Sequence, residues 1–156
     1  RVPPGYDWYP MIRGRLVAVN GAPTSERFAD DERARRTVER EFNLSHAAAM
    51  PAHNRVVEGR WTENEAGALS IEQGVAETLG VKLGDRLRFD IGGLPHEARV
   101  TSIRKVDWGS MRANFFVMYP ARSWASPWWT CWSPPTASSP RPPSSRACCG
   151  AWTRSR

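Results

Sequence analysis

The sequence predicts an α+β fold, with a mixed α/β lobe over residues 1–62, a small antiparallel β lobe over residues 63–120 and a disordered, non-native tail. Three observations carry this prediction. Residues 30–40 have the charge pattern of a surface helix, with acids first and arginines after them. Residues 86–91 alternate apolar and charged side chains, as a half-buried strand does, and residues 114–119 are apolar on both faces.

The first lobe is expected to begin with a strand over residues 11–20, which a turn at residues 20–23 closes. The helix over residues 30–40 follows, with an apolar stripe too thin for a buried helix. Residues 41–44 and 54–61 are then expected to form short strands, separated by a loop. This order of elements predicts a mixed lobe.

The second lobe is expected to begin with a helical unit over residues 70–80. Ser70 and Gln73 have the spacing of a capping box, in which each side chain bonds an unpaired backbone amide at the start of a helix. Gly80 stands where a helix commonly ends in a left-handed residue. The pattern predicts a helix that Ser70 caps and Gly80 ends.

Strands follow this helix at residues 86–91 and 96–103, with Gly92 and Gly93 forming the turn between them. Residues 114–119 should form the most buried strand of the chain, because both of their faces are apolar. One shared core is expected to contain the side chains of Leu87, Phe89, Ile91, Val100, Phe115 and Val117.

The net charge of the chain is concentrated in its last 36 residues. The chain has 22 Lys and Arg against 16 Asp and Glu, but five arginines and no acid lie in residues 121–156. The remaining 17 basic and all 16 acidic residues lie in residues 1–120, so the body is close to neutral. A basic nucleic-acid-binding domain is the alternative function, and it would require a chain ending at residue 120 to bind DNA with a steep salt dependence. The near-neutral body predicts no nucleic-acid partner.

The tail over residues 121–156 is expected to be out of frame. It holds five of the eight tryptophans and no Leu, Ile, Val, Phe or Met, so it cannot build a packed core. When the codons are shifted so that each takes the third base of one residue and the first two of the next, Trp128-Trp129 must read Val, Trp129-Thr130 must read Asp and Cys131-Trp132 must read Leu. The recovered string resembles a strand and predicts a frameshift near residues 120–121.

The residue types needed for catalysis are present without the spacing that catalysis needs. His46, His53 and His96 show no metal-ligand spacing, so surface or core roles are expected for them. No Gly-x-Ser-x-Gly motif occurs, and Gly92-Gly93 lacks the Lys of a phosphate-binding loop. A small hydrolase using His53 or Asp107 is the third hypothesis, and it would require a measured turnover that is lost on His53→Ala. The sequence predicts neither an enzyme nor a cofactor.

A basic and aromatic run near residue 108 is the candidate interaction surface. An exposed Trp flanked by cations is typical of residues that anchor protein interfaces. Alternatively, the Trp covers the core of the small sheet, and both interpretations stay open. The run contains Arg104, Lys105, Asp107, Trp108 and Arg112.

From residue 9 to residue 120, the chain resembles the extracytoplasmic domain of FtsX-like (MacB-like) ABC transporter permeases of the YbbP-type branch. The Arg-Lys-Val-Asp-Trp run at residues 104–108 and its distance from Asn-Phe-Phe at residues 114–116 are the most specific features. The resemblance is carried by residues 9–16, 40–45, 51–54, 59–61, 70–74, 83–85, 100–108 and 114–120.

The resemblance implies a non-catalytic domain on the periplasmic side of a bacterial inner-membrane protein, flanked by membrane helices that lie outside this chain. It implies a cytoplasmic ATP-binding subunit as partner, and an envelope lipid or a periplasmic protein as the substrate that the ATPase helps to transport or extract. After Pro120 the chain departs from the family pattern, which would continue with a further strand and a return to the membrane.

Overall fold

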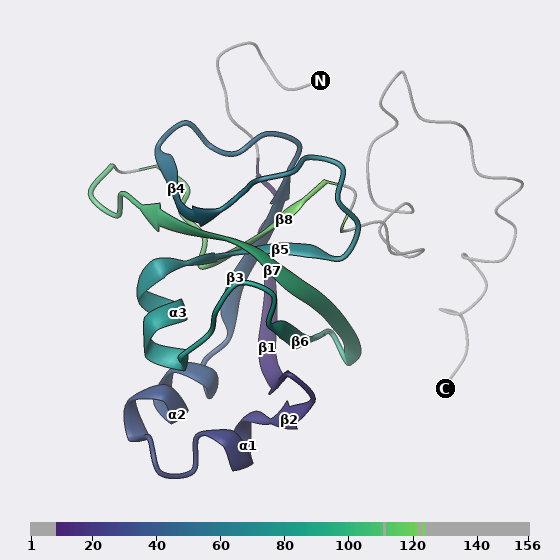
Figure 1. Ribbon diagram of the computed structural model, residues 1–156, viewed down its shortest axis with the longest axis vertical. Helices are drawn as coiled ribbons and strands as arrows, with labels where there is room; N and C mark the ends of the chain where they lie inside the picture. Colours follow the sequence, from purple (N-terminus) through teal and green to yellow (C-terminus); the bar gives the residue numbers. More distant parts are fainter. Residues whose placement is uncertain (1–8, 111, 122, 124–156) are drawn as a thin grey trace, which may run out of the picture. The chain divides into compact units, whose positions relative to one another are not determined.

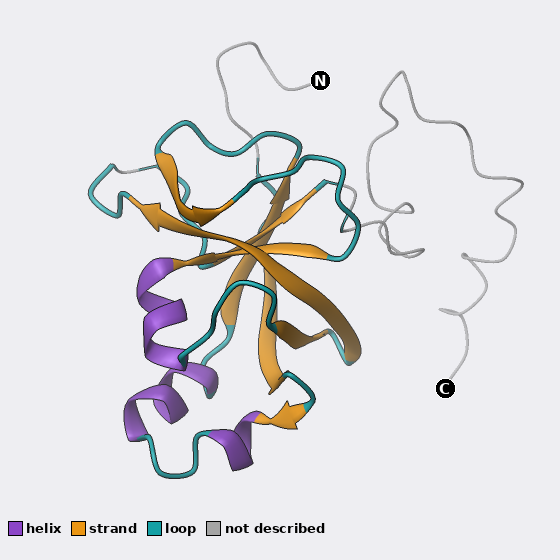
Figure 2. Ribbon diagram, in the orientation of Figure 1, coloured by secondary structure: helices purple, strands orange, loops and turns teal. Residues whose placement is uncertain are grey.

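The computed structural model describes residues 9–110, 112–121 and 123 (Figure 1). This part of the chain is rich in strands and has three short helices (Figure 2). The predicted α+β class is therefore confirmed. The elements are β1 (Ile12–Val19), β2 (Ala22–Pro23), α1 (Thr24–Arg27), α2 (Glu32–Val38), β3 (Phe42–Ala47), β4 (Asn54–Gly59), β5 (Ala68–Glu72), α3 (Gln73–Leu79), β6 (Arg86–Ile91), β7 (Leu94–Val106) and β8 (Val117–Pro120).

Six of the strands pair in a closed ring. β1 pairs with β3, β3 with β8, β8 with β5, β5 with β7, β7 with β6, and β6 again with β1. The β3–β8 and β5–β7 pairs are parallel and the other four are antiparallel. A ring of this kind is a small barrel, whose closure removes the unpaired edges that an open sheet would have. β2 and β4 are attached outside the ring, to β1 and β7.

The inside of the ring is filled by apolar side chains from strands far apart in the sequence. Each of the six residues predicted to form the core is at most 5% exposed, and residues Val117–Pro120 of β8 are all buried. The predicted core residues are therefore confirmed. The last strand is highly buried as predicted, but it begins at Val117 and not at residue 114, and residues 114 and 116 before it are only partly buried. Phe42 and Phe89 pack edge to face, with ring centroids 5.9 Å apart, and join β3 to β6.

The helical unit predicted over residues 70–80 begins later than expected. Residues 70–72 belong to β5, and α3 starts at Gln73. Its cap is Glu72, whose carboxylate accepts a hydrogen bond of 2.9 Å from the backbone amide of Val75. The predicted Ser70 cap is wrong, because Ser70 is a buried residue of strand β5 and lies two positions before the cap. The left-handed end at Gly80 is confirmed, with φ of 60°.

Strands from both predicted lobes take part in the ring. β1 and β3 come from residues 1–62, while β5 to β8 come from residues 63–120. β8 pairs in parallel with β3, an association across some 70 residues of chain, with Leu44 opposite Val117. The boundary between residues 62 and 63 stays a prediction.

The three helices lie on one side of the ring (Figure 2). α1 and α2 contact β1, and α3 contacts β5 and β7. α2 starts at Asp31, whose side chain accepts a hydrogen bond of 3.0 Å from the Ala34 amide, and it buries Ala34 and Val38. α2 also contacts α3, so these two helices lie next to each other.

The predicted out-of-frame tail lies outside the described residues except for Ala121 and Ser123. Ser123 is buried, its Oγ accepts a hydrogen bond of 2.9 Å from the Ala68 amide, and it donates one of 2.5 Å to the Glu65 carbonyl. These bonds fix the end of β8 beside the start of β5.

Candidate functional site: a basic groove beside Trp108

A tight turn after β7 presents Trp108 to solvent. Asp107 makes this turn, because its side chain accepts a hydrogen bond of 3.0 Å from the Gly109 amide and its carbonyl accepts one of 2.9 Å from Asn114 Nδ2. The Trp108 side chain is 49% exposed and packs on Phe116, with ring centroids 4.9 Å apart. Asp107 therefore positions the indole.

The structure separates the five residues of the predicted interaction surface. Arg104 is buried on β7, whereas Lys105, Asp107 and Arg112 are exposed and Asp107 is engaged in its own turn. Trp108 is the one member of this set that lines a groove between α2 and α3. Whether the five residues act together as an interaction surface stays a prediction.

Arg104 was expected on a surface and is fully buried, at 0% exposure. Its Nη2 donates a hydrogen bond of 2.5 Å to the carbonyl oxygen of Phe115. Burial lowers the pKa of Arg104 to about 10, and the nearby Glu72 carboxylate acts in the opposite direction. Arg104 therefore holds the segment before β8 in place from inside the fold. Its Nε and Nη1 make no hydrogen bond within the described residues.

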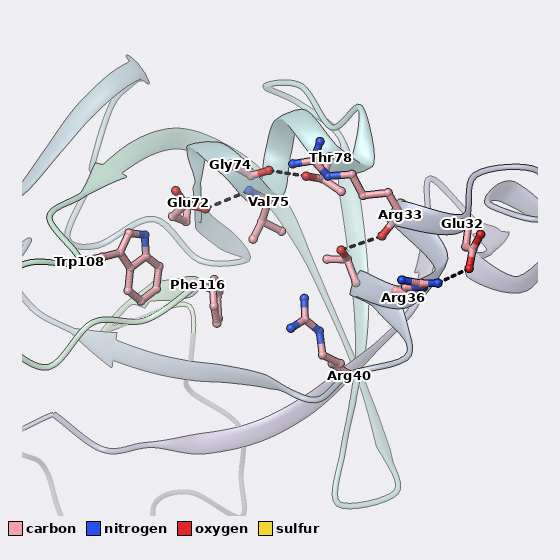
Figure 3. Close-up of a pocket in the computed structure, with 11 residues that line it drawn as sticks. Glu32, Arg33, Arg36, Arg40, Glu72, Gly74, Val75, Thr78, Trp108 and Phe116 are labelled. Carbon is pink, nitrogen blue, oxygen red and sulfur yellow. Dashed lines mark hydrogen bonds and ion pairs between the residues drawn. The ribbon is translucent and has the colours of Figure 1, made fainter.

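The groove has a volume of about 710 Å³ and lies between α2 and α3 (Figure 3). One wall is basic, the facing wall carries small side chains of α3, and one end is aromatic. Figure 3 shows Arg40 reaching from beyond the end of α2 toward the side where Phe116 lies. The residues of these three parts are Arg33, Arg36 and Arg40, then Gly74 and Thr78, then Trp108 and Phe116.

Both carboxylates of the groove are already engaged. Glu32 forms an ion pair with Arg36 one turn along α2. Glu72 caps α3 and acts on the buried Arg104. Within the described part of the chain, Arg33 and Arg40 make no ion pair. The groove therefore has an excess of positive charge that its own acids do not offset.

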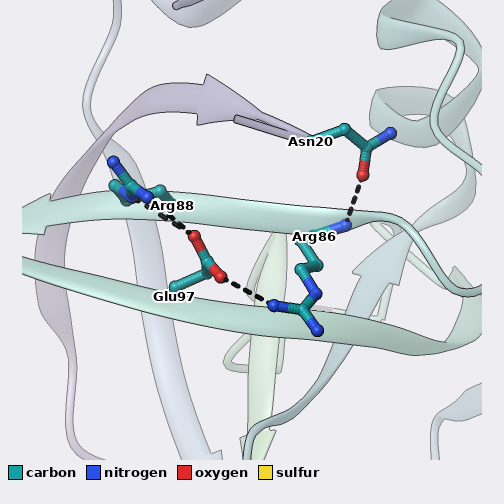
Figure 4. Close-up of polar contacts among 4 residues, drawn as sticks. All are labelled: Asn20, Arg86, Arg88 and Glu97. Carbon is teal, nitrogen blue, oxygen red and sulfur yellow. Dashed lines mark hydrogen bonds and ion pairs between the residues drawn. The ribbon is translucent and has the colours of Figure 1, made fainter. Parts of the chain in front are cut away.

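A second exposed group of arginines, on β6, has a different arrangement (Figure 4). Arg86 and Arg88 both reach Glu97 on β7, at 3.4 Å and 3.0 Å. The hydrogen bonds from Arg88, followed by its charge and then by Arg86, lower the pKa of Glu97 below its ordinary value. Both arginines of this group are therefore paired with a carboxylate, in contrast to Arg33 and Arg40 of the groove.

The histidines do not come together. Burial lowers the pKa of both His46 and His96, while His53 Nε2 lies 3.2 Å from the Ala113 carbonyl. Across residues 9–110, 112–121 and 123, no three His, Cys, Asp or Glu side chains are grouped as a metal site would need. No helix in the described residues is long and apolar enough to cross a membrane.

Comparison with known proteins identifies a protein with a similar sequence, which the geometry of the groove cannot do. No protein-family model matches the chain. Over 113 residues, however, the chain is 41% identical to an uncharacterized ABC transporter permease, YbbP, of Escherichia coli strain K12. The chain is homologous to a segment of an ABC transporter permease. The match covers 72% of this chain and 13% of the relative, so the chain spans about an eighth of the length of that permease.

A solved structure has a similar fold. It is a domain of a protein of Porphyromonas gingivalis that is provisionally assigned as a permease. The superposition covers 80% of this chain and 54% of that one, with a TM-score of 0.52 and 14% sequence identity. At this identity the likeness concerns the fold alone.

Proposed function

We propose that the chain is a non-catalytic, extracytoplasmic domain of an ABC transporter permease in a bacterial inner membrane. The observation that carries the proposal is the 41% identity to a permease over 113 residues. In the proposed function, a cytoplasmic ATP-binding subunit hydrolyses ATP, and the domain moves with membrane helices to transport or extract an envelope lipid or protein. The closed ring of strands supports this role, because a small barrel moves as one body and can transmit a displacement.

The location can be tested with single cysteines in the full-length permease. Residues 1–120 contain no Cys, so a reactive thiol can be placed there alone once any cysteines elsewhere in the protein are replaced. Lys82→Cys lies at an exposed position and Ala98→Cys, at 3% exposure, is the buried control. In intact cells with a permeable outer membrane, a membrane-impermeant maleimide should label Lys82→Cys and leave Ala98→Cys unlabelled. Labelling of Lys82→Cys only after lysis would place the domain in the cytoplasm and end the proposal.

Coupling between this domain and ATP hydrolysis needs a separate experiment. The full-length permease should co-purify with an ATP-binding subunit, and the ATPase rate of the complex should depend on the domain. A disulfide between the domain and a neighbouring membrane helix, formed and then reduced in the same sample, tests this dependence reversibly. An ATPase rate and a transport rate that both stay constant through oxidation and reduction would contradict coupling through this domain.

A further inference from the structure

The groove between α2 and α3 has the features of a binding surface, and these do not depend on the proposed transporter function. Arg33 and Arg36 lie one turn apart on α2, and Arg40 follows the end of the helix. At a rise of about 1.5 Å per residue, the seven positions from Arg33 to Arg40 correspond to roughly 10 Å between their Cα atoms. All three side chains line the groove. In Figure 3 the Arg40 guanidinium points toward the Phe116 end, and that of Arg36 is turned toward Glu32, with which it is paired.

The opposite wall, on α3, carries small side chains and one acid. Gly74 has no side chain there, and the Glu72 carboxylate that caps α3 lies beside it. The Thr78 hydroxyl is turned back to its own helix, where it donates a hydrogen bond of 2.8 Å to the Gly74 carbonyl. At one end, Trp108 and Phe116 provide an apolar surface, and Trp108 is 49% exposed. The groove therefore combines three arginines with one apolar contact, and its acid on α3 is engaged by the helix.

We propose that this groove binds an acidic, extended segment of a partner protein. Carboxylates of the segment pair with Arg33, Arg36 and Arg40, and one apolar side chain packs on the Trp108–Phe116 pair. Guanidinium groups suit this role because they bind carboxylates through two parallel hydrogen bonds. Arginine and tryptophan are also the residues that most often dominate the energy of protein interfaces.

The spacing of the charges favours a protein segment over a lipid. Side chains on one face of an extended strand repeat about every 6.8 Å, so two or three carboxylates of such a segment match cations spread over roughly 10 Å. A phospholipid head group concentrates its charge within a few Å and engages fewer of the arginines.

The test uses the full 156-residue chain and defined probes. The first probe is a fluorescein-labelled dodecapeptide with Glu at alternate positions and one central Phe, and the second replaces each Glu by Gln. Fluorescence anisotropy should detect binding of the acidic peptide, and this binding should weaken as the salt concentration rises. The Gln peptide should bind at least about tenfold more weakly. Vesicles of phosphatidylglycerol, compared with phosphatidylcholine, form the third arm.

Matched variants locate the binding. Replacing Arg33, Arg36 and Arg40 together by Gln should weaken binding of the acidic peptide about tenfold or more. The control makes the same change in charge outside the groove, with less than about a threefold effect. Its three exposed residues are Arg13, Arg55 and Arg60. Thr78→Glu, which adds an acid to the facing wall, should also weaken binding, and it provides a second test if circular dichroism shows that the triple variant is unfolded.

Three results would overturn the proposal. Equal weakening in the groove variant and in the control would mean that the acidic peptide responds only to net charge. Equal binding of the Glu and Gln peptides would remove the role of the carboxylates. Binding of phosphatidylglycerol vesicles that is lost in the groove variant, with no loss of peptide binding, would identify an anionic membrane as the ligand. All three outcomes concern the isolated chain, so they are independent of the labelling experiment that tests the transporter proposal.

Discussion

Arginine occupies two contrasting environments near residues 115–116. Arg104 is buried and donates a hydrogen bond to the Phe115 carbonyl. The groove arginines, Arg33, Arg36 and Arg40, are exposed and line the same groove as Phe116 and Trp108. The first environment restricts a cation to a structural role, because a buried charge must be bonded where it lies. The second leaves cations available to a ligand.

The contrast teaches that the number of basic residues says little about what a chain binds. The body of this chain is almost neutral, yet the structure gathers three exposed arginines at one place, of which Arg33 and Arg40 make no ion pair with the described residues, and it buries another arginine. The position of a charge relative to the fold therefore decides its role, and each of the following predictions tests one side of this contrast.

The largest effect is expected from Phe115. Phe115→Ala should lower the free energy of unfolding by about 3–5 kcal/mol, because it removes a ring that is 4% exposed and leaves a cavity. Phe116→Ala is the matched control, since it truncates the neighbouring ring, which is only half-buried and lies in the groove. Urea denaturation of the full chain measures both variants. A smaller loss for Phe115→Ala than for Phe116→Ala would contradict the assignment of Phe115 to the core and of Phe116 to the groove.

Arg104 should give the next largest effect. Arg104→Ala removes the hydrogen bond to the Phe115 carbonyl and leaves a cavity, and it should cost about 2–4 kcal/mol. Arg104→Met should cost less, because it keeps much of the volume and removes a buried charge. The adjacent Lys105→Ala should change stability by less than about 0.5 kcal/mol, since Lys105 is exposed. Equal urea midpoints for the Arg104 and Lys105 alanine variants would contradict the structural role of Arg104.

Local pattern was sufficient for some elements of the fold and not for others. The strand over residues 86–91 was predicted with its observed bounds, because its side chains alternate and two glycines follow it. β5 was missed because both of its faces are buried, so Ser70 sits among apolar neighbours where a cap would be expected. The parallel pairing of β3 with β8 joins segments about 70 residues apart and leaves no local signal.

The candidate site was predicted only in part for the same reason. The charged run around Trp108 singled this residue out, but it left open whether the indole is an exposed interface anchor or covers the core of the sheet. The arginines that share its groove lie on α2, and in the sequence they show only the charge order of a surface helix. The burial of Arg104 could not be predicted from the sequence either. Arg104 stands next to Lys105, and charged residues are rarely buried without a partner.

A smaller effect on stability is expected from the groove itself. The triple variant with Gln at Arg33, Arg36 and Arg40 should change the free energy of unfolding by less than about 1 kcal/mol, because its only ion pair, between Arg36 and Glu32, is exposed. Thermal and urea unfolding of the triple variant and of the control variant with Gln at Arg13, Arg55 and Arg60 should agree closely. A loss similar to that of Arg104→Ala would show that the groove arginines hold the fold together.

The smallest effect should come from the compensated arginines on β6, which are exposed like those of the groove but share a carboxylate. Arg88 donates two hydrogen bonds to Glu97, at 3.3 Å and 3.0 Å, whereas Arg86 donates one at 3.4 Å. Arg88→Gln should therefore raise the pKa of Glu97 more than Arg86→Gln does, and an NMR pH titration of the Glu97 side chain measures this difference.

The sign of the pH dependence follows from the lowered pKa of Glu97. Because the carboxylate holds its proton less tightly in the folded chain than in the unfolded chain, its contribution to stability is complete above the unfolded pKa and disappears as the pH falls through the folded pKa. The stability difference between the unmodified chain and Arg88→Gln should thus be present at pH 7 and vanish in strong acid. A variant with Gln at Arg33 and Arg40 alone, which keeps the Arg36–Glu32 ion pair, should show no such acid-dependent loss, because neither residue has a carboxylate partner among the described residues. If both variants lost the same stability over the same pH range, the two exposed groups of arginines would be equally compensated, and the groove would have no excess charge to offer a partner.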